Sequence, residues 1–242
     1  MITNSRKLTK DLAIHRYQGQ VSNIYILEDN QQKATFLVDC GMPSDASLLI
    51  DALSSMPPLK HIVCTHFHVD HVSGWLTLKK IFKDCKIWFH EKAKPGVRGH
   101  ERIPFPAFVD LTAILIPCMK ESGYFPGIGE LLYGGLYGTP FKKGFPGNRI
   151  NFFTTAQPVL PGFTIIHTPG HRPDSVSFFD PLSGILISGD FLVVINGRVI
   201  INTFVANQKD QEDSIKKIKN IKGIKFIYPG HGICRPFSIK EL

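Results

Sequence analysis

The chain has 242 residues, of which 43% are hydrophobic and 20% charged, so its composition is that of a globular protein and not of a disordered or fibrous one. It contains no apolar run near the roughly 20 residues that a membrane-crossing helix needs, and no apolar stretch follows residues 1–10 as in a signal peptide. The formal charge of +8 favours anionic partners, and the five cysteines form no CxxC pair, so we expect a soluble cytoplasmic protein with reduced cysteines.

The first part of the chain predicts alternating strands and helices. Apolar runs at residues 21–27 and 34–38 predict two strands, separated by turn residues. Ser44 is the expected N-cap of a helical segment over residues 46–53. The next expected elements are a short buried strand at residues 62–64, a helix at 74–82 and a strand at 86–89.

Residues 94–150 differ from the rest in composition. They are rich in proline, glycine and aromatic residues, and only residues 107–119 have the pattern of an apolar helix. Long aromatic loops in compact domains are commonly functional. We therefore predict one domain over residues 1–242 with an insertion at about 94–150. This insertion could act as a lid or a wall of the substrate pocket, or instead form a dimer contact or a capping subdomain.

The last part again predicts strands, followed by a basic helix. Residues 163–166, 176–179 and 185–187 predict three strands, residues 210–219 a helix and residues 225–228 a final strand. In and after the helix, Lys216, Lys217, Lys219 and Lys222 alternate with isoleucines, as on the exposed face of an amphipathic helix. No aromatic residue interleaves with them, which disfavours a binding site for single-stranded nucleic acid.

One short segment concentrates residues that bind metals. Residues 66–71 have the form HxHxDH, and three imidazoles with a carboxylate in six residues have few uses other than metal binding. Three further candidates each follow an apolar run with small or turn residues beside them. They are His171 in HTPGH, Asp190 in SGD and His231 in PGHG.

The order of these four motifs resembles the metallo-β-lactamase superfamily, and within it the glyoxalase II-like branch with two metals. The resemblance implies an α/β (α+β) fold, a four-layer αβ/βα sandwich with the metals at one edge of two sheets. It also implies the role of each ligand: His66, His68 and His171 on the first metal, Asp70, His71 and His231 on the second, and Asp190 bridging them. Asp39 matches a family position beside the site and is expected to orient a ligand.

Imidazole and carboxylate ligands without thiolates suit zinc, with iron and manganese as alternatives, so we expect two divalent ions. Two such ions can share a hydroxide that attacks a carbonyl or phosphoryl centre. Asp70 is the expected catalytic residue because its carboxylate can accept a proton as the intermediate collapses.

The leading hypothesis is a binuclear hydrolase that cleaves an ester, thioester or lactone of a small-molecule substrate with an acyl or anionic group. Only residues 232–242 follow His231, too few for the helical region that holds glutathione in glyoxalase II, so a glutathione thioester is not favoured. Val193 stands where related lactonases often carry tyrosine, which weakens the lactonase hypothesis. The alternatives are a persulfide dioxygenase with one iron and, less favoured, a phosphodiesterase or nuclease. No membrane partner is expected, and a homodimer stays open.

Overall fold

The structure of the chain is a computed structural model that describes residues 1–101, 112, 116–117, 120, 141, 144–147 and 149–242. Most of the helix expected at residues 107–119, like most of the expected insertion, lies outside the described residues. The division into one domain with an insertion therefore stays a prediction.

The first half of the chain begins with four strands and then alternates helices with strands. In order they are β1 (Ile2–Lys7), β2 (Leu12–Gln18), β3 (Asn23–Asp29), β4 (Ala34–Val38), α1 (Pro43–Leu53), β5 (Leu59–Val63), α2 (Val69–Val72), α3 (Trp75–Ile81), β6 (Lys86–His90), the 3₁₀ turn Glu91–Ala93 and α4 (Lys94–Val97). The second half contains β7 (Ile150–Phe153), β8 (Thr164–His167), β9 (Val176–Asp180), β10 (Ile185–Gly189), β11 (Leu192–Ile195), β12 (Arg198–Ile201), α8 (Gln208–Lys219), β13 (Phe226–Pro229), β14 (Arg235–Pro236) and the 3₁₀ turn Ile239–Glu241.

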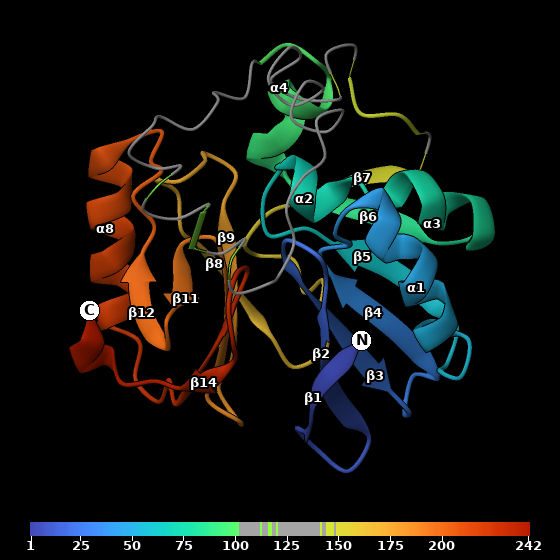
Figure 1. Ribbon diagram of the computed structural model, residues 1–242, viewed down its shortest axis with the longest axis horizontal. Helices are drawn as coiled ribbons and strands as arrows, with labels where there is room; N and C mark the ends of the chain where they lie inside the picture. Colours follow the sequence, from blue (N-terminus) through green and yellow to red (C-terminus); the bar gives the residue numbers. More distant parts are fainter. Residues whose placement is uncertain (102–111, 113–115, 118–119, 121–140, 142–143, 148) are drawn as a thin grey trace.

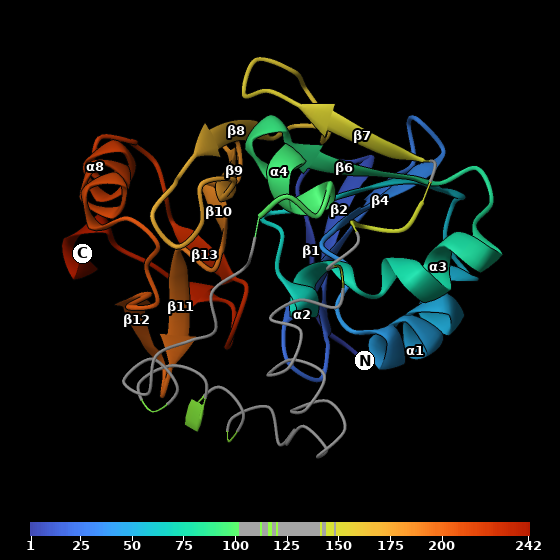
Figure 2. The ribbon, with the colours of Figure 1, turned by 90° about the horizontal axis from the view of Figure 1, so that it is seen from above.

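The strands form two main sheets. The first has seven strands in the order β1-β2-β3-β4-β5-β6-β7, and the second has five in the order β14-β13-β10-β9-β8. A separate two-stranded ribbon joins β11 and β12. Figures 1 and 2 show α1 and α3 outside the first sheet and α8 outside the second. The layers are thus helix, sheet, sheet and helix, which is the predicted four-layer sandwich.

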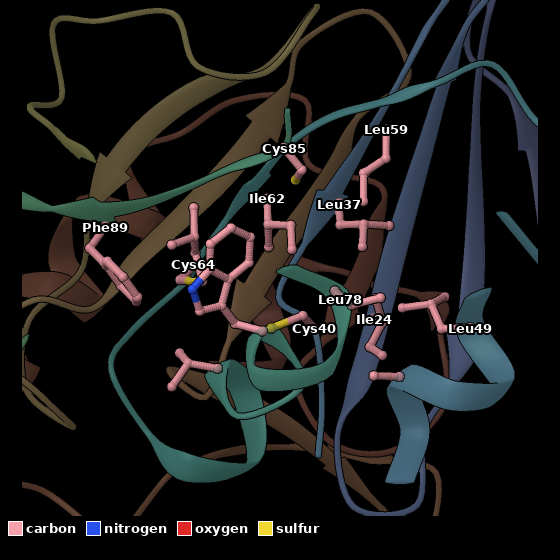
Figure 3. Close-up of a cluster of buried hydrophobic side chains, with 14 of the residues drawn as sticks. Ile24, Leu37, Cys40, Leu49, Leu59, Ile62, Cys64, Leu78, Cys85 and Phe89 are labelled. Atoms are coloured by element: carbon pink, nitrogen blue, oxygen red, sulfur yellow. The ribbon is translucent and has the colours of Figure 1, made fainter. Parts of the chain in front are cut away.

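Three groups of buried side chains fill the spaces between these layers. Phe36 and Val63 of the first sheet meet Phe178 and Ile187 of the second sheet in the central group. A second group lies between the first sheet and α1 and α3, as Figure 3 shows for Ile62 and its neighbours. A third packs α8 against the second sheet. Alternate residues of a strand point to opposite faces, which explains how each sheet serves two groups.

The cysteines that the structure describes behave as core residues. All four are free; Cys40, Cys64 and Cys85 are buried and Cys234 is half-buried. Burial raises the pKa of each of these thiols, that of Cys85 to about 12. These thiols are therefore protonated at neutral pH and are poor nucleophiles. Among the described residues, no helix has both the length and the apolar character that crossing a membrane requires.

The expected N-cap of the first helix was wrong. The helix α1 begins at Pro43 with Met42 as its N-cap, because proline is pre-set for the first helical position and Asp45 accepts a hydrogen bond from the Met42 N–H at 2.9 Å. Ser44 is the second residue of the helix, and its hydroxyl donates a hydrogen bond to the Gln20 side chain.

The prediction of an exposed basic face on α8 is confirmed. Ile218 is buried, while the lysines around it are exposed.

Candidate metal centre

The metal-ligand candidates all lie just beyond the ends of strands. The loop after β5 carries His66 and His68, and α2 follows directly with Asp70 and His71. The other three follow strands of the second sheet: His171 after β8, Asp190 after β10 and His231 after β13. The parallel pairing of β10 with β13 brings Asp190 and His231 to the same edge. The helix α2 also lies there, because Nε2 of its His71 is 3.2 Å from Oδ1 of Asp190.

The first group contains His66, His68, His171 and Asp190, whose ligand atoms all lie within 4.8 Å of one another. The Nδ1 atom of His68 is 3.1 Å from Nε2 of His66 and 3.0 Å from Nε2 of His171. The Oδ2 atom of Asp190 is 3.8 Å from Nε2 of His66 and 3.7 Å from Nε2 of His171. Three imidazoles and a carboxylate therefore direct their nitrogen and oxygen atoms toward one point.

The second group contains Asp70, His71 and His231, again within 4.8 Å of one another. Asp190 also contacts this group, because Oδ1 is 3.2 Å from Nε2 of His71 and Oδ2 is 3.2 Å from Nε2 of His231. The Asp190 carboxylate thus lies between the two groups. Its Oδ2 atom faces the first group and His231, and its Oδ1 atom faces His71.

Asp39 orients the loop and one of its histidines. Its Oδ1 atom accepts a hydrogen bond from the Thr65 N–H at 2.7 Å, and Oδ2 accepts from Nδ1 of His71 at 2.8 Å. Because Nδ1 of His71 is held in this way, Nε2 faces Asp70 and Asp190. This is the type of contact that orients metal-binding histidines in other proteins.

Backbone carbonyls orient two other histidines. Nδ1 of His171 donates to the Phe204 carbonyl at 2.6 Å, and Nδ1 of His231 donates to the Val21 carbonyl at 2.9 Å. A ring nitrogen that faces a carbonyl must carry the proton, which leaves Nε2 with a free lone pair. Both rings therefore present Nε2 to the centre of the site.

The turn that carries His231 is fixed from the first sheet. Asn23 donates from its backbone to the Gly230 carbonyl at 2.7 Å and from its side chain to the Gly232 carbonyl at 2.8 Å. Arg16, which is buried, donates to Asn23 at 2.9 Å and to the same Gly232 carbonyl at 3.0 Å. The bonds from the Arg16 guanidinium are charge-assisted, and together these contacts hold the end of the second sheet against the first.

The charges of the two groups differ. Burial lowers the pKa of His66, His68 and His171, so these imidazoles are neutral at pH 7 and can offer lone pairs. Burial also acts to lower the pKa of His71, but Asp190 and the other carboxylates beside it outweigh burial and hold that pKa well above its usual range. The buried carboxylates thus require a nearby positive charge.

The donor atoms fit a metal. Among the described side chains, Nε2 of His71 and Oδ1 of Asp190 are buried and make no hydrogen bond of acceptable geometry, although they lie only 3.2 Å apart. Buried polar atoms without partners are rare in native proteins, and a bound ion is one way in which such atoms are satisfied. With the other four imidazoles and the Asp70 carboxylate, these two side chains form a ligand set suited to divalent zinc, iron or manganese.

Gly230 provides space for Asp190, which leads to a testable prediction. A Cβ atom on Gly230 would lie 2.2 Å from Oδ1 of Asp190, 3.0 Å from the Gly189 carbonyl carbon and 3.0 Å from the His71 ring. We expect Gly230→Ala to displace the Asp190 carboxylate and to lower activity by about 10–100-fold, as for other residues that support metal ligands. Gly223→Ala is the control: its Cβ would have nothing within 4 Å, and its positive φ of 88° adds backbone strain far from the ligands. Equal activity of the two variants would contradict the prediction.

Two residues of the site carry no signal in the sequence. The Phe204 ring stacks over His68 at 5.9 Å between centroids, and the Asn202 side chain accepts from the Phe204 N–H at 2.9 Å. They follow β12, a strand that the apolar patterning did not predict.

His167 is not among the expected ligands. Its Nε2 atom donates a hydrogen bond to the Pro173 carbonyl at 2.8 Å, so its side chain is bonded to the loop that carries His171.

Comparison with known proteins identifies the family. A model of the metallo-beta-lactamase superfamily matches residues 17–231. The chain therefore belongs to the metallo-β-lactamase superfamily, a superfamily of metal-dependent hydrolases. Its fold and its buried His and Asp cluster agree with that assignment.

Two curated proteins of Bacillus subtilis (strain 168) resemble the chain. One is named "Probable metallo-hydrolase YflN"; it is 24% identical over 211 residues, which are 81% of this chain and 70% of that protein. The other is named "Uncharacterized protein YobT"; it is 27% identical over 182 residues, which are 74% of this chain and 65% of that protein.

Several solved structures share the fold. The B3 metallo-beta-lactamase BLEG-1 has a TM-score of 0.62 with 22% identity, covering 94% of this chain and 95% of that chain. TTHA1623 in a di-iron-bound form has a TM-score of 0.60 with 23% identity, covering 92% and 93%. ST1585 from Sulfolobus tokodaii has a TM-score of 0.59 with 21% identity, covering 92% and 81%. At these identities the likeness concerns the fold alone.

Proposed function

We propose that the protein is a binuclear metal-dependent hydrolase of the glyoxalase II-like branch, which cleaves an ester, thioester or lactone bond. The observation that carries the proposal is the position of Asp190. Its two oxygens lie 3.2 Å from Nε2 of His71 and 3.2 Å from Nε2 of His231, while His66 and His171 of the first group are 3.8 and 3.7 Å away. A carboxylate between two ligand groups is suited to bridging two ions.

In the proposed assignment, three histidines of the first group and Asp70, His71 and His231 of the second would hold the two ions, with Asp190 placed between the two groups. Ions held there would polarise a carbonyl oxygen and would lower the pKa of a bound water toward neutrality. The chain supplies the geometry for this chemistry, because Asp39 and two backbone carbonyls fix the histidine rings before any substrate binds.

Asp70 is the residue that we propose to accept a proton. Its side chain is 19% exposed, whereas His71 and His231 beside it are 0% and 7% exposed. It lies 3.5 Å from Nε2 of His71 and 3.4 Å from Nε2 of His231. Both histidines lower the pKa of Asp70 against the opposing effect of burial, so the group is a carboxylate at neutral pH and can receive a proton.

The ligand set suits zinc, with iron and manganese as alternatives. TTHA1623, which shares the fold, was crystallised in a di-iron-bound form, and this supports including iron beside zinc and manganese. A cytoplasmic location and a small acyl or anionic substrate are part of the proposal. The location is inferred from the free cysteines, the anionic group from the charge of +8, and the acyl group from the apolar, aromatic composition of residues 94–150.

The experiment that tests the proposal combines elemental analysis of the purified protein with a panel of thioesters, lactones, aryl esters, β-lactams and phosphodiesters. We expect about two metal ions per chain and hydrolysis of one of the first three classes. A single iron, with oxygen uptake on persulfides and no hydrolysis, would replace the proposal by the dioxygenase alternative. Hydrolysis of phosphodiesters alone would replace it by the nuclease alternative.

A further inference from the structure

Behind the first group of ligands, a buried ion pair joins three segments of the chain. We infer that Asp174 and Arg172 are positioning residues that hold the loop carrying His66 and His68, and that Glu101 supports them from the segment after α4. This inference rests on the proposed metal centre, and it assigns a role to residues that bind no metal themselves.

Asp174 connects the two loops that carry the first group. Its Oδ2 atom accepts a hydrogen bond at 2.7 Å from the backbone N–H of Phe67, the residue between His66 and His68. Its Oδ1 atom accepts from Nε of Arg172 at 2.9 Å. Both oxygens of the carboxylate are therefore occupied by donors, and each bond is charge-assisted.

Arg172 follows His171 directly, and its side chain is only 2% exposed. A buried guanidinium is tolerated only when it is paired. Besides Asp174, which is 1% exposed, Arg172 has Glu101 at 3.4 Å from one of its terminal nitrogens. Its backbone is fixed as well, because the Arg172 N–H donates to the Ser175 hydroxyl at 3.2 Å.

The side chain of Phe67 is fixed by packing against other aromatic rings. Its ring packs against Phe89 of β6, with 5.4 Å between centroids, and against Phe141 and Phe145, with 5.6 Å each. Gly96 of α4 lies close enough that a Cβ atom there would be 2.9 Å from the Phe67 ring and 3.6 Å from Arg172. The backbone and the side chain of Phe67 are thus both fixed, which sets where its two neighbouring histidines point.

Asparagine at position 174 tests this role without a large change of shape. An amide has one acceptor oxygen, and its NH₂ group would face a donor, either the Phe67 N–H or the Arg172 Nε–H. Asp174→Asn must therefore lose one of the two bonds. The loop should then hold His66 and His68 less firmly, and the first group should bind metal more weakly.

The measurement is a cobalt(II) titration of the metal-free full chain, followed by visible absorption and by competition with a chelator. His171→Ala identifies which binding step belongs to the first group. We expect Asp174→Asn to weaken that step by about 10–100-fold and to alter its cobalt spectrum, with the second step unchanged. We expect Glu101→Gln to weaken it by about two- to fivefold, since this pair is partly exposed.

The chain offers matched controls for both variants. Asp174 lies just before β9, and Asp180 is the last residue of that strand. Asp180 is 2% exposed and accepts hydrogen bonds from the Leu182 and Ser183 backbone N–H groups. Asp180→Asn therefore removes a similar carboxylate far from the ligands. Glu241 pairs with Arg235 at 3.1 Å and is 32% exposed, which matches Glu101 at 30%. Asp180→Asn and Glu241→Gln should bind cobalt as the unmodified chain does.

Several outcomes would overturn the inference. Wild-type cobalt binding by Asp174→Asn would refute the positioning role, as would an equal loss in Asp180→Asn. An unchanged first step in Glu101→Gln would remove Glu101 from it. If Asp174→Asn fails to fold, the double variant Arg172→Gln/Asp174→Asn, which leaves no unpaired charge at position 172, is measured in the same way. A wild-type chain that binds no cobalt would instead refute the proposed metal centre.

Discussion

Replacing Asp190 by asparagine is expected to produce the largest loss of activity of any single substitution. The carboxylate presents one oxygen to His71 and the other to His231 and the first group, whereas an amide has one oxygen that can accept or coordinate. We expect the metal content to fall from about two ions toward one and kcat/KM to fall by about 10³-fold, which corresponds to roughly 4 kcal/mol.

Elemental analysis and steady-state kinetics of the same preparation check this expectation. Asp180→Asn is the control, because it changes a buried carboxylate of the same sheet without touching the ligands. An Asp190→Asn chain that keeps two ions and wild-type kcat/KM would show that Asp190 does not bridge the two groups.

Removal of metal is expected to have the largest effect on stability. An ion that binds the folded chain at 1,000 times its dissociation constant stabilises it by about 4 kcal/mol. For a domain of this size, each kcal/mol shifts the melting temperature by about 2–4 °C, so a chelator should lower Tm by roughly 10 °C. The physical cause is the charge of the buried Asp190 and the half-buried Asp70, which only the neighbouring histidines offset once the ions leave.

Thermal unfolding followed by circular dichroism, with and without chelator, measures the shift. Adding zinc back should restore the original Tm, and Asp190→Asn should show a smaller chelator effect because it holds less metal at the start. A chain shown to contain metal whose Tm does not change with chelator would contradict a site formed only in the folded state.

The fold could be predicted in outline because buried strands have continuous apolar runs. Residues 34–38 form β4 as expected, and residues 86–89 fall within β6. Two of the missed strands, β1 and β2, have other patterns, whereas β11 was missed although Leu192–Ile195 is a continuous apolar run. β1 is an edge strand with mostly exposed polar residues, and β2 carries the buried Arg16, which finds its partners only in the folded chain. Neither strand has a continuous apolar run that would mark it in the sequence.

The ligand candidates could be predicted because each combines a metal-binding side chain with a position just after a strand. HxHxDH is also local, so its four members lie within six residues whatever the rest of the chain does. The supporting residues are not local. Asp174 lies 107 residues from Phe67, whose N–H donates to it, and Asn202 and Phe204 lie after a strand with no distinctive motif.

The sequence by itself therefore determined the α/β class, the family and the chemical types of the ligands, because these depend on apolar runs and on short motifs. The tertiary structure decided which nitrogen of each histidine faces the centre, and that Asp190 lies between the two groups. These features depend on partners such as the Val21 carbonyl, 210 residues from His231, and the Phe204 carbonyl, 33 residues from His171. Only the packing of one sheet on the other brings such groups within hydrogen-bonding distance.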